Sequence, residues 1–143
     1  IPSRMEPLFV YASSSDLPVW CGLSAKREAI GSPLKSWHDE TVTFEKIIAL
    51  ANNYGFEGMG IMHTSVDTVE FALKQINKEF TGIVMAYPDS GYFAAPNWQF
   101  QDIITPPDLL NFARKWTAIG CGVFGGCCGL GPEHTKKLCE LRN

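Results

Sequence analysis

The chain has 143 residues, and its 45% hydrophobic and 19% charged content is that of an ordinary folded domain, which excludes disordered and fibrous proteins. Its formal charge of −3 comes from 12 basic and 15 acidic residues scattered along the sequence, so no basic block is available for nucleic acid or an anionic membrane. The apolar runs are far shorter than the roughly 20 residues of a spanning helix. We expect one cytoplasmic domain over residues 1–143.

The cysteines are five in number, an odd count without the even spacing of a secreted disulfide framework. We therefore expect reduced thiols. The sequence begins at Ile1 instead of methionine and stops soon after its last helical pattern begins, so we interpret it as a fragment.

The first predicted unit is a strand followed by a helix. Leu17–Leu23 is an apolar run that predicts a buried strand, and the polar stretch over 24–40 predicts a long loop. From Thr43 to Ala51 the apolar residues recur at helical spacing, and Tyr54-Gly55 ends that helix.

The same unit then repeats along the chain. Phe56–Met62 predicts a second strand, and the residues Thr64–Asp67 resemble a capping box that opens a helix as far as Ile76. Ile83–Tyr87 predicts a third strand, and Pro88–Gly91 has the chemistry of a turn.

The last two helices are predicted by their start signals. Thr105 followed by Pro106 is typical of a helix start, and a fourth strand over Gly122–Gly125 leads to a helix that begins at Pro132. The loop over 92–104 predicts an apolar cover for the rim of the fold, with a lid as the alternative; its members are Tyr92, Phe93, Pro96, Trp98 and Phe100.

Four strand–helix units in succession predict a parallel sheet covered by helices, because parallel neighbours need a crossover connection. Two architectures remain open: a doubly wound open sheet, or half of an eight-stranded barrel. No G-x-G-x-x-G pattern follows the first strand, which disfavours a nucleotide-binding sheet. In both architectures the functional groups follow the carboxyl ends of strands, here His63-Thr64, Tyr87–Gly91 and Gly126–Gly129.

The pair Cys127-Cys128 lies at one of these strand ends and is bracketed by glycines. The glycines permit an irregular backbone that turns both thiols toward one point, where two thiolates would hold a thiophilic cation such as zinc. Two other interpretations remain: a pair of ordinary buried thiols, or a strained disulfide between adjacent residues.

The sequence Gly-Gly-Cys-Cys-Gly, followed by Gly-Pro-Glu-His, resembles the end of the homocysteine S-methyltransferase family, whose domains use betaine, S-methylmethionine or methylfolate as methyl donor. Four segments are similar to the fifth to eighth strands of that family, in order Leu17–Trp20, Gly60–His63, Tyr87–Gly91 and Gly125–Gly129. The resemblance implies an α/β fold, the (β/α)8 TIM barrel, of which this chain covers about the last four βα units.

The resemblance also implies a zinc site. In the family three thiolates hold the ion, and two of them match Cys127 and Cys128. His63 stands where the third cysteine would be, and Met62 stands where the family has asparagine. An imidazole is an ordinary zinc ligand, so a Cys2His set with an open fourth position is expected. The alternative is that His63 only makes a hydrogen bond and that the metal has been lost.

The remaining cysteines, Cys21, Cys121 and Cys139, are expected to be packing residues. The turn residues Tyr87, Asp89 and Ser90 are candidates for binding the amino-acid end of a substrate, although Asp89-Ser90-Gly91 is also simply a good turn.

The implied activity is that of a cytoplasmic methyltransferase in methionine biosynthesis, in which a small-molecule donor methylates the zinc-bound thiol of homocysteine. Three alternatives stay open: a degenerate noncatalytic barrel, a metal- or thiol-binding protein of the same fold, and methyl transfer to another thiol or selenol. A half barrel exposes two strand edges, so the chain alone is expected to aggregate, to form a homo-oligomer or to fail to fold.

Overall fold

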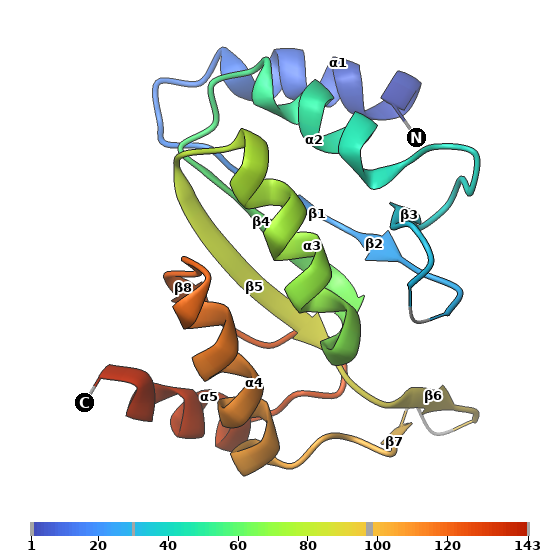
Figure 1. The fold of residues 1–143 in the computed structure, drawn as a ribbon, viewed down its shortest axis with the longest axis vertical. Coiled ribbons are helices and arrows are strands. Elements are labelled where there is room, and N and C mark those ends of the chain that lie inside the picture. The colour runs from blue at the N-terminus through green and yellow to red at the C-terminus, as the bar shows by residue number, and fades with distance from the viewer. Residues whose placement is uncertain (1, 30, 97–98, 143) are drawn as a thin grey trace.

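The computed structural model describes residues 2–29, 31–96 and 99–142 of the chain (Figure 1). Its main sheet has four parallel strands in the order β1-β4-β5-β8, which confirms the predicted parallel α/β arrangement. Their bounds are Trp20–Leu23 for β1, Gly58–Ser65 for β4, Ile83–Asp89 for β5 and Val123–Phe124 for β8. Within the described residues β1 and β8 are the edges of this sheet.

The strands alternate with helices, as the periodicity predicts. The helices are α1 (Pro2–Ser13), α2 (Phe44–Asn52), α3 (Val66–Glu79), α4 (Pro106–Ala118) and α5 (Pro132–Leu138), followed by the short 3-10 helix η1 (Cys139–Arg142). No helix in the described part of the chain has the length and apolar character needed to cross a bilayer.

Two of the helix starts form as predicted. Thr43 caps α2 by accepting a hydrogen bond from the Lys46 amide, and Thr105 caps α4 by accepting one from the Asp108 amide. The predicted capping box at α3 is wrong, because the Ser65 side chain makes no cap hydrogen bond there. Its hydroxyl donates instead to the Asp67 carboxylate at 2.6 Å.

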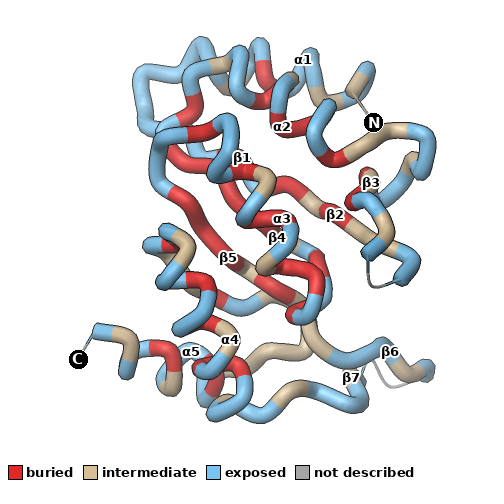
Figure 2. The backbone as a smooth tube through the Cα atoms, in the orientation of Figure 1, coloured by how far each residue is buried: buried red, intermediate tan, exposed pale blue. Residues whose placement is uncertain are grey.

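The core lies between the sheet and the helices that cover it. Figure 1 shows α3 lying over β4 and β5, and Figure 2 shows buried residues running along both strands. Ile61 of β4 and both Leu73 and Ile76 of α3 are completely buried. Each such side chain stabilises the fold by about 1.5–3 kcal/mol relative to an exposed one. Between the two strands, a side chain at Gly60 would overlap the backbone of Met85, so only glycine permits this approach.

The loops contain more regular structure than the sequence predicts. A two-stranded antiparallel pair, β2 (Ala25–Lys26) with β3 (Lys35–Ser36), interrupts the loop after β1. A hairpin of β6 (Tyr92–Ala94) and β7 (Gln99–Gln101) follows β5. Both pairs satisfy their backbone groups locally, which composition alone does not reveal.

The expectation that the 92–104 loop covers the rim is wrong for its first residues. Tyr92 and Phe93 are 54% and 43% exposed, and the β6–β7 hairpin extends away from the body of the molecule (Figure 1). The two strands pair with each other, so they need no packing against the main sheet. Trp98, assigned to the same cover, lies outside the described residues.

Two of the three cysteines predicted to be packing residues are indeed buried. Burial raises the pKa of Cys21 and of Cys121 to about 12, so both stay neutral thiols. The prediction for Cys139 is wrong: it is exposed in η1, beyond the last turn of α5, where its thiol is 3.5 Å from the Thr135 carbonyl oxygen.

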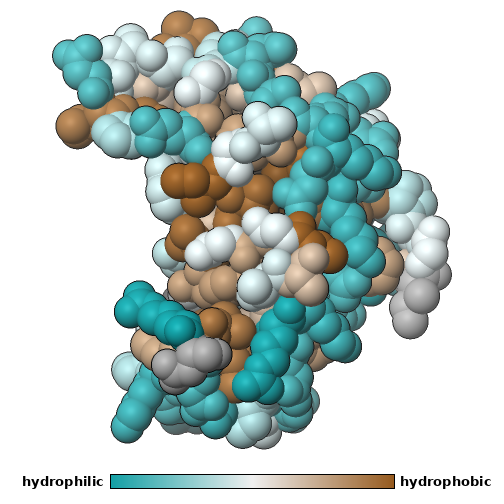
Figure 3. All heavy atoms as spheres, turned by 60° about the vertical axis from the view of Figure 1, so that its left-hand side comes forward, coloured by the Kyte–Doolittle hydropathy of each residue, from teal (hydrophilic) through white to brown (hydrophobic). Residues whose placement is uncertain are grey.

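The edge formed by β8 is partly apolar. A cavity of about 430 Å³ beside it has a mixed lining, in which the apolar residues Val123, Phe124, Leu138 and Leu141 stand beside polar residues such as Thr117, Thr135 and Arg142. Figure 3, which brings forward the side that carries this edge, shows apolar side chains reaching the surface where the molecule is hollowed. An edge strand with apolar neighbours is a surface that normally pairs with further structure.

Candidate metal centre

Three potential metal ligands converge at the carboxyl ends of the parallel strands. The ligand atoms of His63, Cys127 and Cys128 all lie within 4.8 Å of one another. The Cys127 sulfur is 3.2 Å from Nδ1 of His63 and 3.9 Å from the Cys128 sulfur. His63 belongs to β4 and the thiols follow β8, so the fold unites groups that are 64 residues apart.

His63 reaches this point because β4 contains a bulge. Met62 pairs with Tyr87 and Ser65 pairs with Asp89, so three steps along β4 match two steps along β5. His63 lies in the bulge with a φ of 47°, a left-handed conformation that costs a residue other than glycine on the order of 1–3 kcal/mol. The bulge takes the imidazole out of the regular alternation of the strand.

The next residue, Thr64, holds the bulge in place. Its side chain is fully buried, and its hydroxyl accepts a hydrogen bond from the Ala25 amide at 3.1 Å and donates to the Met62 carbonyl at 2.9 Å. Breaking such a buried pair costs about 1–3 kcal/mol, so the β2 segment helps to fix the position of His63.

The loop that carries the thiols is tied to β5, and to Ser90 directly after it, by three backbone hydrogen bonds. The Gly125 amide donates to the Ala86 carbonyl, and the Cys127 amide donates to the Pro88 carbonyl at 2.9 Å. In the opposite direction the Ser90 amide donates to the Cys128 carbonyl at 3.0 Å. These bonds continue the sheet beyond its last regular strand and bring both sulfurs beside His63.

Gly129 is required where the thiol loop turns. Its φ is 79°, and a side chain there would overlap the Ser90 carbonyl oxygen. We expect Gly129→Ala to lower the free energy of unfolding by at least about 1–2 kcal/mol, the cost of the left-handed conformation alone. Urea unfolding measures this difference.

Gly122→Ala is the matched control for that substitution. Gly122 precedes the same loop, and no atom lies within 4 Å of the position that its side chain would take. Equal destabilisation by the two alanines would contradict the role given to Gly129.

The electrostatics of the cluster favour a cation. Burial, followed by the neighbouring Cys127 thiol and the Asp89 carboxylate, raises the pKa of Cys128. The pKa of Asp89 is also raised, mainly by burial, and the nearby His63 offsets part of that rise. Three acidic groups thus meet with one imidazole, and a bound cation would stabilise their charged forms.

The spacing of the donor atoms fits zinc. Zinc–sulfur bonds of about 2.3 Å in a tetrahedron place two sulfurs about 3.8 Å apart, and the sulfurs of Cys127 and Cys128 are 3.9 Å apart. Two thiols and an imidazole are a donor set that zinc accepts, with a fourth position open.

The predicted substrate residues lie at the same edge of the sheet. Asp89 is half-buried. It is close enough to Cys128 to raise the pKa of that thiol, and close enough to His63 for the imidazole to lower the pKa of the Asp89 carboxyl. The Tyr87 ring lies against Gly125, where any side chain would overlap it. The Ser90 hydroxyl accepts a hydrogen bond from the Ile104 amide at 2.8 Å. Asp89 and Ser90 also line a pocket of about 280 Å³.

Two residues organise this site in ways that the sequence does not predict. Thr64 lies at a predicted strand end, but its hydroxyl holds the bulge instead of capping a helix. His134, a member of the motif after the thiols, is buried beside the thiol loop. A histidine at the third position of a helix was the one available signal, since such a side chain can cap the helix start.

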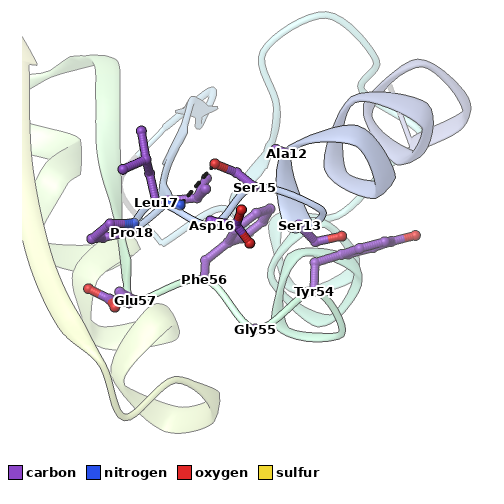
Figure 4. A pocket seen from close by; sticks show the side chains of 11 residues that line it. Ala12, Ser13, Ser15, Asp16, Leu17, Pro18, Tyr54, Gly55, Phe56 and Glu57 are labelled. Atoms are coloured by element: carbon purple, nitrogen blue, oxygen red, sulfur yellow. Dashed lines mark hydrogen bonds between the residues drawn. The ribbon is translucent and has the colours of Figure 1, made fainter.

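A different pocket, of about 390 Å³, lies at the opposite end of the sheet. Figure 4 shows it between the end of α1, the segment over 15–19 and the residues Tyr54–Glu57, where β1 and β4 begin. Functional groups of parallel α/β folds lie at the carboxyl ends of strands, so this pocket is not the candidate site.

Comparison with known proteins identifies a family and a set of similar solved structures, two of which are described here. The homocysteine S-methyltransferase family profile matches residues 4–142. Crystal structures of the homocysteine methyltransferase MmuM from Escherichia coli are similar in their metallated form (TM-score 0.53, 21% identity, 71% of this chain and 30% of that one) and their oxidized form (0.55, 21%, 73% and 31%). No curated protein sequence matches the chain.

At 21% identity the solved structures show a shared fold. The chain spans about 30% of the length of the metallated MmuM structure. The family match covers nearly all of this chain.

Proposed function

Because the chain belongs to the homocysteine S-methyltransferase family, we propose that His63, Cys127 and Cys128 bind one zinc ion and that the whole protein methylates the thiol of homocysteine to form methionine. The observation that carries this proposal is the convergence of the three ligand atoms within 4.8 Å. We also propose that the four βα units belong to a (β/α)8 barrel, whose remaining strands would pair with the edges β1 and β8.

Each ligand has a distinct part in this proposal. Cys127 and Cys128 supply two thiolates, and His63 supplies a neutral nitrogen, so the protein contributes two negative charges where three cysteines would contribute three. A zinc ion held in this way would lower the pKa of a substrate thiol, so that a thiolate nucleophile exists at neutral pH. Because His63 adds no negative charge, we expect the thiolate to be less nucleophilic than in a three-cysteine site.

Asp89 is the best candidate to bind the ammonium group of homocysteine. Its carboxylate is half-buried beside the proposed metal ligands, and His63 is the neighbouring group that lowers its raised pKa. An ammonium group would give this carboxylate a full positive partner. Tyr87 would form a wall of the site, and Ser90, whose hydroxyl accepts from Ile104, can still donate its proton to a substrate.

A second candidate function is metal or thiol binding without methyl transfer. The residues Met62 and His63 favour it, because they stand where the family has asparagine and cysteine. The two functions differ in whether a methyl donor is consumed, but they share the metal site.

The binding of a thiol substrate can be tested with cobalt(II) as a spectroscopic probe. We expect homocysteine to increase the sulfur-to-cobalt charge-transfer absorption of the cobalt-loaded protein, since one position is open for a further thiolate. Homoserine, which has a hydroxyl in place of the thiol, should leave the spectrum unchanged. Identical responses to the two compounds would contradict thiol binding.

In the same experiment, Asp89→Asn tests whether Asp89 contributes to the binding of the substrate ammonium group and not to the binding of its thiol. A hydrogen bond to a charged group is worth about 1.5–3 kcal/mol, so the variant should bind homocysteine about 10- to 150-fold more weakly. Its affinity for 3-mercaptopropionate, which has a thiol but no ammonium group, should change little. Equal losses for both compounds would show that Asp89 does not bind the ammonium group.

A further inference from the structure

We propose that His134 is a positioning residue for the two thiols: it closes a ring of hydrogen bonds that holds the Cys127-Cys128 loop at the distance from His63 that a shared metal requires. The proposal deepens the proposed metal site and rests on it for its purpose. The ring itself is made of contacts present in the protein.

One half of the ring leads from His134 to the thiol loop through two other segments. The His134 Nε2–H donates to the Ile104 carbonyl at 2.7 Å. The Ile104 amide donates to the Ser90 hydroxyl oxygen at 2.8 Å, and the Ser90 amide donates to the Cys128 carbonyl at 3.0 Å. Three consecutive bonds therefore join α5, the segment after the hairpin, the end of β5 and the thiol loop.

The other half of the ring returns to the same loop directly. The Gly131 amide donates to His134 Nδ1 at 3.1 Å, and Gly131 lies three residues beyond Cys128. Gly131 is the N-cap residue immediately before α5, so His134 caps its own helix with one nitrogen and reaches Ile104 with the other. The loop is thereby held at Cys128 and at Gly131 by one side chain.

These bonds fix the tautomer of the imidazole. A neutral imidazole has one N–H and one acceptor nitrogen. Because Nδ1 accepts from the Gly131 amide and Nε2 donates to the Ile104 carbonyl, the proton lies on Nε2. An oxygen of Glu133 also lies 3.1 Å from Nδ1, but the Glu133 side chain is 63% exposed and can turn into solvent. The Gly131 amide is therefore the partner that Nδ1 accepts from.

Burial makes the ring costly to break. His134 is 4% exposed, so a substitution that removes its nitrogens leaves the Gly131 amide and the Ile104 carbonyl without their partner. An unpaired buried donor or acceptor costs about 1–3 kcal/mol. A helix cap alone would not need a bond to Ile104, 30 residues away, and this second bond extends the effect of His134 to Ser90 and the thiols.

The test compares His134→Phe, His134→Gln and Ser90→Ala in the full chain. Phenylalanine fills the space without hydrogen bonds, glutamine offers both a donor and an acceptor, and Ser90→Ala opens the ring while His134 stays intact. Val69→Ala, a fully buried position on α3 outside the ring, controls for general destabilisation. The readouts are the site-resolved rate of iodoacetamide alkylation of Cys127 and Cys128 in metal-free protein and the dissociation constant for cadmium(II).

We expect His134→Phe and Ser90→Ala to accelerate alkylation of the thiol pair several-fold, and His134→Phe to weaken cadmium binding about 10- to 100-fold, as supporting residues of metal sites do. His134→Gln should recover most of both properties. The double variant Ser90→Ala/His134→Phe should be little worse than the more affected single variant, because both open one ring.

Alkylation rates in Ser90→Ala and His134→Phe that match Val69→Ala would overturn the proposal, as would strictly additive effects in the double variant. If His134→Phe does not fold, Ser90→Ala and His134→Gln decide the matter by the same rates. Wild-type protein that binds no cadmium would sink the proposed metal site, but the alkylation rates would still decide whether the ring holds the thiols.

Discussion

Replacing Cys127 and Cys128 together with serine is expected to abolish zinc binding while the fold persists. A site with four ligands is worth about 10–16 kcal/mol, or roughly 3 kcal/mol for each ligand, so the loss of two thiolates should weaken binding on the order of 10⁴-fold. The serine hydroxyls are nearly the same size but stay protonated at neutral pH. Metal analysis after dialysis should give one zinc for each wild-type chain and none for the variant.

The matched control for the serine pair is Cys139→Ser. Cys139 is an exposed thiol in η1 and lies outside the cluster of ligands, so its loss should leave the zinc content unchanged. Circular dichroism and urea unfolding check that the fold of the double variant is preserved. Zinc retained by the Cys127→Ser/Cys128→Ser protein would place the metal elsewhere. A wild-type protein without zinc would contradict the proposed metal site, although the chain would still have the fold of the family.

Much of the fold could be predicted from the sequence because its signals are local. Thr105 followed by Pro106 fixes the start of α4 through a hydrogen bond that spans three residues. The periodicity after Thr43 predicts α2 for a similar reason, since the buried positions Ile47, Ile48 and Ala51 share one face of the helix. Strands separated by helices then imply a parallel sheet.

The shape of β4 could not be predicted, because it depends on contacts between distant residues. The bulge is defined by the pairing of Met62 and Ser65 with β5, and Thr64 stabilises it through Ala25, 39 residues earlier. From the sequence alone Thr64 is equally suitable as a helix cap. The hydroxyl bonds to the bulge instead because tertiary structure places the Ala25 amide beside it.

The candidate site shows the same division between local and distant signals. The motif around Cys127 and Cys128 is contiguous, so the thiol pair is visible in the sequence. His63 was found through an ungapped match to the family, and the structure brings its ring within 3.2 Å of a thiol. The ring through His134 left no comparable signal, because its partners at Ser90 and Ile104 belong to other segments of the chain.

Removing the imidazole of His63 should weaken zinc binding by about 100-fold, the share of one ligand in a four-ligand site. The measurement is a competition titration of His63→Ala with a chromophoric chelator. His63→Cys, which restores the three thiolates of the family, should bind zinc at least as tightly as the wild type. Under the proposed function, its additional negative charge should also make a metal-bound homocysteine thiolate a stronger nucleophile, and the rate of methyl transfer by the whole protein would report this.

His63→Asn distinguishes the loss of the imidazole ligand from a change in the backbone conformation of the bulge. His63 has a φ of 47°, and asparagine adopts this left-handed conformation more readily than most residues but is a poor zinc ligand. If His63 is a ligand, the asparagine and alanine variants lose zinc affinity to a similar extent, although asparagine keeps the bulge. Wild-type affinity in both variants would mean that His63 only makes a hydrogen bond to Cys127 and that the third ligand comes from another part of the protein. A loss confined to alanine would assign the effect to the bulge, because only alanine disfavours its backbone.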